Sequence, residues 1–380
     1  MIESSESSES SESSESFDVL VIGAGFAGSI VARELAEAGR KVTIIEKRGH
    51  IGGNAHDFRD DYGIQVHAYG PHIFHTNSDQ VLDYLSRFTS WRPYAHRVRA
   101  QVEGRLYPFP INRTTINQLY GLALDSAGTS AFLERVREKN LAVRSSLDVA
   151  LATLGKDLTD RFIRGYSRKQ WGLDLANLSP AVLARLPVRC NDDDRYFTDK
   201  HQCMPRDGYA ALFERLLDHP AIEQRLNMDY FAHRDRLSCE RLVCTAPIDE
   251  YFGFRFGRLP YRSLRFEMQH IANVDRFQET AVVNFPNDYE FTRITEFKHL
   301  TGQRATGTTI AREYPCASGD PYYPMMTSEA QTLYRKYRQL AGREKNVTFV
   351  GRMAEYRYYN MDQVVASALA KVRRIVSGQP

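Results

Sequence analysis

The sequence DVLVIGAGFAGSIVARELAEAGRKVTIIEKRGHIGGN occupies residues 18–54 and has three recognisable parts. An apolar run that ends at Ile22 predicts a buried β-strand, and Gly-Ala-Gly-Phe-Ala-Gly follows at residues 23–28. A helical segment and a second apolar run then lead to Glu46. A strand, a glycine turn, a helix and a second strand that ends in an acid form the layout of a dinucleotide-binding βαβ unit.

Each residue type in this unit has a physical task. Gly23 permits a tight turn, Gly25 lets the backbone approach a pyrophosphate at the helix N-terminus, and Gly28 allows the helix to pack closely on the strand. Glu46 follows Gly28 at the spacing expected of an acid that accepts hydrogen bonds from a ribose. Small residues also suit an ordinary strand-to-helix turn, but this context favours nucleotide binding.

A second glycine pair stands just beyond the acidic strand, at Gly52 and Gly53. This placement resembles flavoproteins that bind FAD more than it resembles NAD-dependent enzymes. The expected cofactor-binding residues of the unit are Gly23, Gly25, Phe26, Ala27, Gly28, Glu46, Lys47, Gly53 and Asn54.

Bulk composition is typical of a soluble, cytoplasmic enzyme. With 380 residues, 42% of them hydrophobic, the chain can bury a large core and form more than one domain. It has no apolar run of the ~18 residues that a membrane span needs, and its N-terminus does not read as a signal peptide. The five cysteines include no Cys-x-x-Cys pair, which predicts reduced thiols and no zinc site.

The N-terminal segment differs from the rest of the chain. Residues 1–16 repeat Glu-Ser-Ser with a period of three and predict a disordered acidic leader. Because five glutamates belong to this repeat, the remainder is more basic than the net charge of +3 for the whole chain. A basic body suits an anionic ligand, and we find no motif for nucleic acid.

The remaining sequence predicts an α/β fold in which a Rossmann-like FAD-binding domain is discontinuous. Residues 129–140 and 147–156 have helical character, whereas 281–285 and 291–295 resemble strands joined by a turn. The predicted parts are the FAD-binding domain at 17–90, 201–254 and 326–380, a β-sheet segment at 91–113, a helical substrate domain at 114–180, a mobile loop and sheet segment at 181–200, and an antiparallel sheet domain at 255–325.

Several motifs that follow one another along the chain bear on its family. They are Gly70 to Thr76, Phe109 to Asn112, Tyr166 to Gly172, Arg185 to Arg189, Asp193 to Phe197, Met204 with Pro205, Phe291 to Lys298, Tyr322 to Pro324, and Gly351 to Tyr358. In this order they resemble the bacterial UDP-galactopyranose mutase family, and the resemblance covers nearly everything after the leader.

This resemblance implies an isomerase, an intramolecular transferase, that interconverts UDP-galactopyranose and UDP-galactofuranose with no net redox change. It implies that FAD is active when reduced, with NAD(P)H or another reductant needed for activation, and that flavin N5 attacks the anomeric carbon and displaces UDP. It further implies a homodimer, a role in cell-surface polysaccharide biosynthesis, and no membrane or nucleic-acid partner.

The resemblance also assigns roles to individual residues. Arg185 and Arg293 would follow the diphosphate as it leaves and returns, and His75 would lie beside the flavin; these three are the expected catalytic residues. Tyr166 and Trp171 would stack on uracil. The full expected substrate-binding set is His96, Phe162, Tyr166, Ser167, Trp171, Arg185, Tyr196, Asn284, Arg293, Tyr323 and Tyr358.

Two histidines three residues apart, His72 and His75, also invite a metal interpretation. No cysteine or carboxylate ligands accompany them, so we predict no metal and expect contact with the flavin ring instead. The further cofactor-binding residues implied by the resemblance are His72, Ile73, Arg352, Tyr359, Asn360, Met361, Asp362, Gln363 and Val364.

Two positions depart from the family pattern. Asn360 stands where an acid is common, which predicts retained activity with a changed substrate affinity, and His96 stands where relatives often have asparagine. Two other functions stay open at this point. One is an amine-oxidase-like FAD oxidoreductase, and the other is a nucleotide-sugar-binding protein without catalysis.

Overall fold

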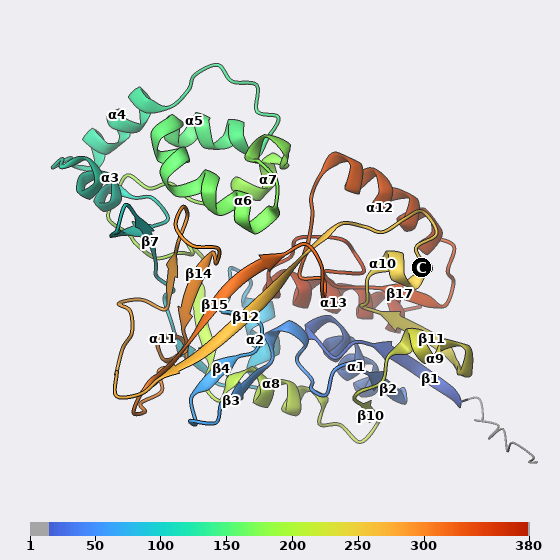
Figure 1. Ribbon diagram of the computed structural model, residues 1–380. Helices are drawn as coiled ribbons and strands as arrows, with labels where there is room; N and C mark the ends of the chain where they lie inside the picture. Colours follow the sequence, from blue (N-terminus) through green and yellow to red (C-terminus); the bar gives the residue numbers. More distant parts are fainter. Residues whose placement is uncertain (1–14, 379–380) are drawn as a thin grey trace, which may run out of the picture.

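The computed structural model describes residues 15–378. It contains two large sheets and a group of helices that adjoins the second of them (Figure 1). Most of the expected leader, residues 1–16, lies outside the described residues. Glu15 and Ser16, however, already belong to the first strand, because the parallel pairing to Leu237 and Ser238 continues through them. Our predicted boundary was two residues too late.

The first sheet is parallel and has the strand order β10-β2-β1-β11-β17. Its strands come from three separate parts of the sequence: β1 (Glu15–Ile22), β2 (Val42–Ile45), β10 (Ile222–Arg225), β11 (Leu237–Cys244) and β17 (Val347–Phe349). Helices α1 (Phe26–Glu37), α8 (Gly208–Leu217) and α13 (Met361–Val376) pack together beside it.

Both faces of this sheet are buried, which explains the unbroken apolar runs in its strands. Val19 and Val21 pack into one hydrophobic cluster, whereas Leu20 and Ile22 pack into a second cluster on the opposite face. The second cluster includes residues of α10 (Ile248–Tyr251) and α12 (Ser328–Ala341).

The second sheet has seven strands in the order β16-β12-β15-β14-β13-β7-β8, and all pairs except β13 with β7 are antiparallel. Its strands are β7 (Val98–Val102), β8 (Arg105–Phe109), β12 (Tyr261–Ile271), β13 (Val282–Asn284), β14 (Arg293–Glu296), β15 (Thr308–Cys316) and β16 (Tyr323–Pro324). Helix α11 (Phe297–Thr301) follows β14 directly.

A helical segment lies over one end of the seven-stranded sheet, at the upper left of Figure 1. It comprises α3 (Arg113–Tyr120), α4 (Ser126–Val136), α5 (Ser146–Leu158), the π-helical turn η2 (Thr159–Arg164), α6 (Gly165–Trp171), η3 (Leu175–Asn177) and α7 (Pro180–Leu183). Its helices begin at strong capping residues, since Asn112, Asp125 and Ser145 each accept a hydrogen bond from the first turn.

Smaller elements connect these parts. They are η1 (Gly53–Ala55), the pair β3 (Asp57–Arg59) and β4 (Gln65–His67), the three-stranded sheet of β5 (Phe74–Thr76), β9 (His201–Pro205) and β6 (Trp91–Pro93), and α2 (Asp79–Ser86), α9 (Tyr230–His233) and η4 (Arg234–Arg236). Within residues 15–378, no helix combines the length and the apolar character that crossing a membrane requires. The α/β fold class that we predicted, with a discontinuous Rossmann-like domain, is confirmed by these sheets and helices.

Candidate active site

The turn between β1 and α1 lines an open cavity, which we call the glycine cavity. Gly23 has a φ of +92°, and a Cβ on it would lie 2.3 Å from Thr245 Oγ1. A Cβ on Gly28 would lie 1.9 Å from the carbonyl oxygen of Gly23. Only glycine fits these positions, and the resulting tight turn exposes the N-terminus of α1 to the cavity.

Glu46 directly follows β2 beside this turn and is buried. Its carboxylate accepts hydrogen bonds from the backbone N–H groups of Ala24 and Arg48, each at 3.0 Å. The acid is therefore held in place by the turn itself, with its side chain in the cavity wall. The Arg48 side chain in turn donates to Asn54 Oδ1 at 3.0 Å, which ties the second glycine pair to the same strand end.

Most of the expected cofactor-binding residues line this cavity. They are Gly23, Gly25, Phe26, Ala27, Glu46, Lys47, Gly53, Asn54, His72, Arg352, Met361 and Val364. Gly28 lies behind the turn and acts through packing. Asp362 instead accepts a hydrogen bond from the Thr76 hydroxyl at 3.0 Å, and Gln363 is exposed and accepts one from the Asn360 N–H.

A second cavity adjoins the first at His72, Arg352 and Met361, and we call it the bridging cavity. Three guanidinium groups lie in its wall, those of Arg185, Arg293 and Arg352. Ile73, Tyr359 and Asn360, which we expected at the cofactor, line this cavity rather than the glycine cavity. Its positive charge makes it the part of the molecule best suited to an anion such as a diphosphate.

Arg293 is the most rigidly held of the three guanidiniums. It begins β14, and its Nε and Nη2 donate to the two carboxylate oxygens of Glu313 on β15, both at 2.8 Å. Glu313 is 1% exposed, so this bidentate pair is shielded from water. Burial opposes the charge of Arg293, but the charge and hydrogen bonds of Glu313 act together with Tyr166 and Tyr323 and raise the pKa of Arg293 well above its usual value.

Arg185 is held more loosely, in the exposed loop that follows α7. It donates to the amide oxygen of Asn360 and, at 3.4 Å, to the carbonyl oxygen of Tyr358. Its guanidinium also lies 4.4 Å from the centre of the Tyr358 ring. These contacts bring the loop against the segment that leads into α13.

A third cavity opens from the bridging cavity and is lined mainly by aromatic side chains; we call it the aromatic cavity. Helix α6 supplies Tyr166, Ser167 and Trp171. The structure brings together here every expected substrate-binding residue except Arg185: His96, Phe162, Tyr166, Ser167, Trp171, Tyr196, Asn284, Arg293, Tyr323 and Tyr358. The ring centres of Trp171, Tyr323 and Tyr358 lie 5.4 to 6.1 Å apart.

His96 is the basic ring in the aromatic cavity. It is 4% exposed, and Tyr94 Oη lies 3.1 Å from its Nδ1. Burial, aided by the charge of Arg293, lowers the pKa of His96 to about 3, so the ring is neutral at physiological pH. It can serve as a hydrogen-bonding group without adding charge.

His75 and His72 have different surroundings. His75 lines the bridging cavity, where its ring stacks on Phe197 at 3.7 Å and its Nδ1 lies 2.9 Å from Asp199 Oδ2. His72 lies where the glycine and bridging cavities meet, and burial lowers its pKa to about 3. Of the two rings, only that of His72 borders the glycine cavity.

Sequence reasoning missed several residues that shape these cavities. Glu313, which orients Arg293, carries no local signal because it lies on the neighbouring strand. Gly351 has a φ of +98°, and a Cβ there would lie 2.9 Å from Ala27 Cβ. The glycine turn before Arg352 was the sequence feature that could have indicated this close approach. Thr245, from the end of β11, also lines the glycine cavity.

Comparisons with known proteins agree with this geometry. A family model described as UDP-galactopyranose mutase matches residues 161–358, and one described as an NAD(P)-binding Rossmann-like domain matches residues 21–88. The chain is 38% identical to a probable UDP-galactopyranose mutase of Klebsiella pneumoniae, over 95% of both chains. It is also 39% identical to a dTDP-fucopyranose mutase of Escherichia coli, over 92% of this chain and 96% of that protein.

A solved structure of a reduced UDP-galactopyranose mutase superposes with a TM-score of 0.76, at 17% identity, over 95% of this chain and 94% of the other. That likeness concerns the fold. The family match covers the region that builds most of the aromatic and bridging cavities, and the sequence similarity to curated members extends over nearly the whole chain. The chain belongs to the flavin-dependent UDP-galactopyranose mutase family.

Proposed function

We propose that this protein is an isomerase that interconverts UDP-galactopyranose and UDP-galactofuranose and that requires reduced FAD. The observation that carries the proposal is the continuity of three cavities. The glycine cavity, suited to a dinucleotide, opens into a bridging cavity with three guanidiniums, which opens into an aromatic cavity suited to a nucleobase. Oxidation of an amine requires neither the three guanidiniums of the bridging cavity nor a cavity for a nucleobase.

The glycine cavity fits FAD. Gly25 and Gly53 approach so closely that a Cβ on Gly53 would lie 3.0 Å from Gly25 Cα, which keeps side chains out of the space above the α1 N-terminus. That N-terminus begins at Gly25 with no side chain capping it, so its N–H groups are available to a pyrophosphate. Glu46 is placed to accept hydrogen bonds from a ribose, and Met361 and Val364 would flank the ring system.

Bound and reduced, FAD supplies a nucleophilic N5 for the anomeric carbon of the sugar, and NAD(P)H or another reductant would generate that state. The protein's own groups handle the departing nucleotide. Arg293, fixed by Glu313, and Arg185, on its loop, are placed to hold the diphosphate near the reacting carbon as the anomeric bond breaks and reforms.

The remaining side chains position the substrate and limit water. Tyr166 and Trp171 offer flat faces to uracil, and the hydroxyls of Tyr196, Tyr323 and Tyr358 can donate to phosphate oxygens without adding charge. Burial raises the pKa of Tyr196 and Tyr323, which keeps both phenols protonated. The loop after α7 would exclude water when Arg185 contacts Asn360.

The similarity to the E. coli enzyme suggests a second candidate substrate, dTDP-fucopyranose. The chain is 39% identical to that enzyme and 38% identical to the Klebsiella enzyme, so sequence identity does not favour one substrate over the other. Both substrates offer a pyrimidine base, a diphosphate and a galactose-configured sugar. The reaction type is the same, and the two candidates differ only in which nucleotide sugar is preferred.

The test is to incubate the FAD-loaded protein with UDP-galactofuranose and, separately, with dTDP-fucofuranose, each with and without dithionite. Formation of the pyranose from UDP-galactofuranose only in the reduced sample supports the proposal, and the ratio of kcat/KM ranks the two substrates. Binding without conversion would indicate a nucleotide-sugar-binding protein, and flavin reduction by an amine would indicate an oxidase.

A further inference from the structure

Lys169 on α6 makes an unusual set of contacts. Its ammonium group donates hydrogen bonds to four backbone carbonyl oxygens of one loop, those of Phe285, Asp288, Tyr289 and Phe291, and the last three lie at 3.1, 3.2 and 3.1 Å. An ammonium has only three hydrogens, so the four oxygens share them. The loop thus surrounds the lysine head with carbonyl groups, as it would surround a bound cation.

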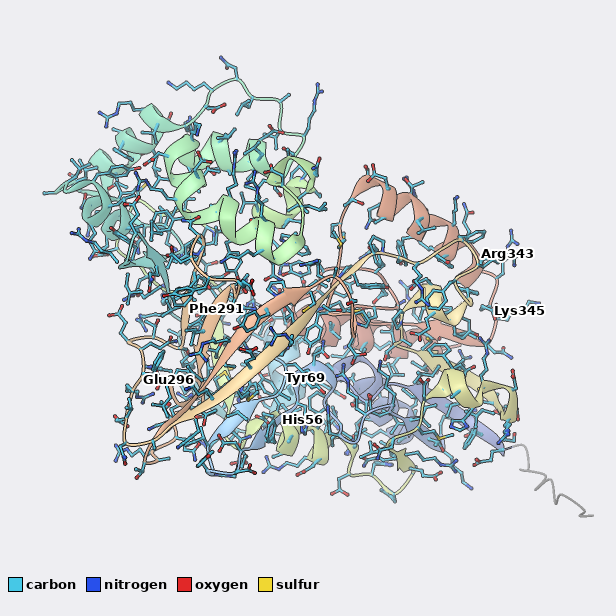
Figure 2. All side chains as sticks on the ribbon, in the orientation of Figure 1. His56, Tyr69, Phe291, Glu296, Arg343 and Lys345 are labelled. Atoms are coloured by element: carbon cyan, nitrogen blue, oxygen red, sulfur yellow. The ribbon has the colours of Figure 1, made fainter. Side chains whose placement is uncertain are left out.

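The loop that receives Lys169 joins β13 to β14. Phe285 directly follows Asn284, and Phe291 precedes Arg293 by two residues. The hydrogen bonds to these two residues therefore lie where the loop joins the strands. The two ends of the loop are joined by a hydrogen bond from the Phe285 N–H to the Thr292 carbonyl oxygen at 2.8 Å. Figure 2 shows Phe291 beneath the helical segment that carries Lys169.

On the other side of the contact, Lys169 belongs to the helix that supplies the aromatic platform. Tyr166 lies three residues before it, on the same face of α6. Lys169 therefore connects the helix that bears Tyr166 and Trp171 to the two strands that bear Asn284 and Arg293. All four of these residues line the aromatic cavity.

We propose that Lys169 is a positioning residue that sets the distance between the base platform on α6 and the diphosphate-binding strands β13 and β14. This inference deepens the proposed function and rests on it only for the identity of the ligand. A nucleoside diphosphate has a fixed span from base to phosphate, so an error in this distance weakens its binding without touching a ligand atom.

Neighbouring contacts are consistent with a junction that requires close approach. A Cβ on Gly165, the first residue of α6, would lie 2.5 Å from the Pro286 carbonyl oxygen. Asn287 also donates to the Arg161 carbonyl at 2.8 Å. These contacts hold the start of α6, whereas Lys169 holds its middle, nearest the platform residues.

The test uses FAD-loaded protein with Lys169→Met, which keeps an unbranched side chain one atom shorter but removes its donors. Arg168→Met is the matched control, because Arg168 is an exposed cation on the same helix that pairs with Asp174. Lys169→Arg keeps the charge, but its planar group does not place three donors toward converging oxygens. The readouts are hydrogen exchange of residues 159–172 and 285–292 without ligand, and the UDP dissociation constant by calorimetry.

We expect Lys169→Met and Lys169→Arg to exchange faster in both segments and to bind UDP about tenfold more weakly, with FAD content and Arg168→Met unchanged. Unaltered exchange in the two segments would overturn the proposal. Wild-type behaviour of Lys169→Arg would also overturn it, because charge alone would then suffice. If wild type bound no UDP, the proposed function would fail, and the exchange data would still decide the role of Lys169.

Discussion

Asn360 offers the most direct test of how the loop after α7 and the diphosphate compete for Arg185. The residue precedes α13, and its amide oxygen accepts a hydrogen bond from the Arg185 guanidinium. Replacing Asn360 with aspartate preserves the shape and this acceptor but gives Arg185 a charged partner. The guanidinium then has less to gain from moving to a diphosphate.

The size of the effect follows from exposure. Arg185 is exposed, and an exposed ion pair stabilises by about 0.5–1 kcal/mol. Competition of that size raises the KM for the nucleotide sugar about 2- to 5-fold. No reacting or binding group is lost, so kcat should change little. An acid at the N-terminus of α13 also interacts favourably with the helix dipole, by about 0.3–1 kcal/mol, so the folded state should not be weakened.

The assay is steady-state conversion of UDP-galactofuranose by dithionite-reduced Asn360→Asp, at low and at high salt. The increase in KM should shrink at high salt, because exposed charges are screened. Ala366→Glu is the control, since it adds one negative charge to an exposed position of the same helix. A variant with wild-type KM and kcat at both salt concentrations would refute the reasoning.

Three further predictions concern the core of the site. Arg293→Lys keeps the cation but loses the bidentate contact with Glu313, so it should lower the unfolding free energy by about 1.5–3 kcal/mol, the value of one hydrogen bond to a charged group, as well as kcat; denaturant melts and turnover check this, and wild-type values for both would contradict it. Gly28→Ala forces a Cβ against the turn, so the purified protein should lack flavin absorbance; a fully flavinated variant would disprove this. Burial lowers the pKa of His67 and His72 to about 4 and about 3, so the unfolded chain binds more protons below pH 6.5. The unfolding free energy should therefore be highest above pH 6.5 and should fall by about 2 kcal/mol per histidine at pH 5. Equal unfolding free energies at pH 7 and 5 would count against this.

The sequence alone predicted the elements that local chemistry determines. The turn at residues 23–28 is recognisable because Gly23 and Gly28 meet steric demands set within the βαβ unit, and the helix that we expected at 147–156 needed only its cap and its apolar period. The fold class was therefore predictable. The membership of the aromatic cavity was not, because its residues come from several distant segments and were found by resemblance to a family.

Contacts between distant elements could not be predicted from the sequence, for a physical reason. Glu313 faces Arg293 because β14 and β15 pair in one particular register, and a shift of one residue would turn it to the other face. The carbonyl groups around Lys169 depend on the path of a loop more than a hundred residues away. The hydrogen bond that Asp362 accepts from the Thr76 hydroxyl likewise joins residues far apart in the sequence, so the sequence could not indicate it.

The parallel sheet has a consequence for how the protein is made. Its strands come from residues 15–45, 222–244 and 347–349, and α13, which packs on α1 and lines the glycine cavity, comes last of all. The ribosome must have synthesised the chain through residue 349 before β17 can pair fully with β11. Until then β1 and α1 have no partners from the C-terminal segment, and the nascent chain has no complete place for its cofactor. The glycine cavity can therefore be complete only after β17 and α13 have been synthesised, so a dinucleotide that fills it binds late in the folding of the chain.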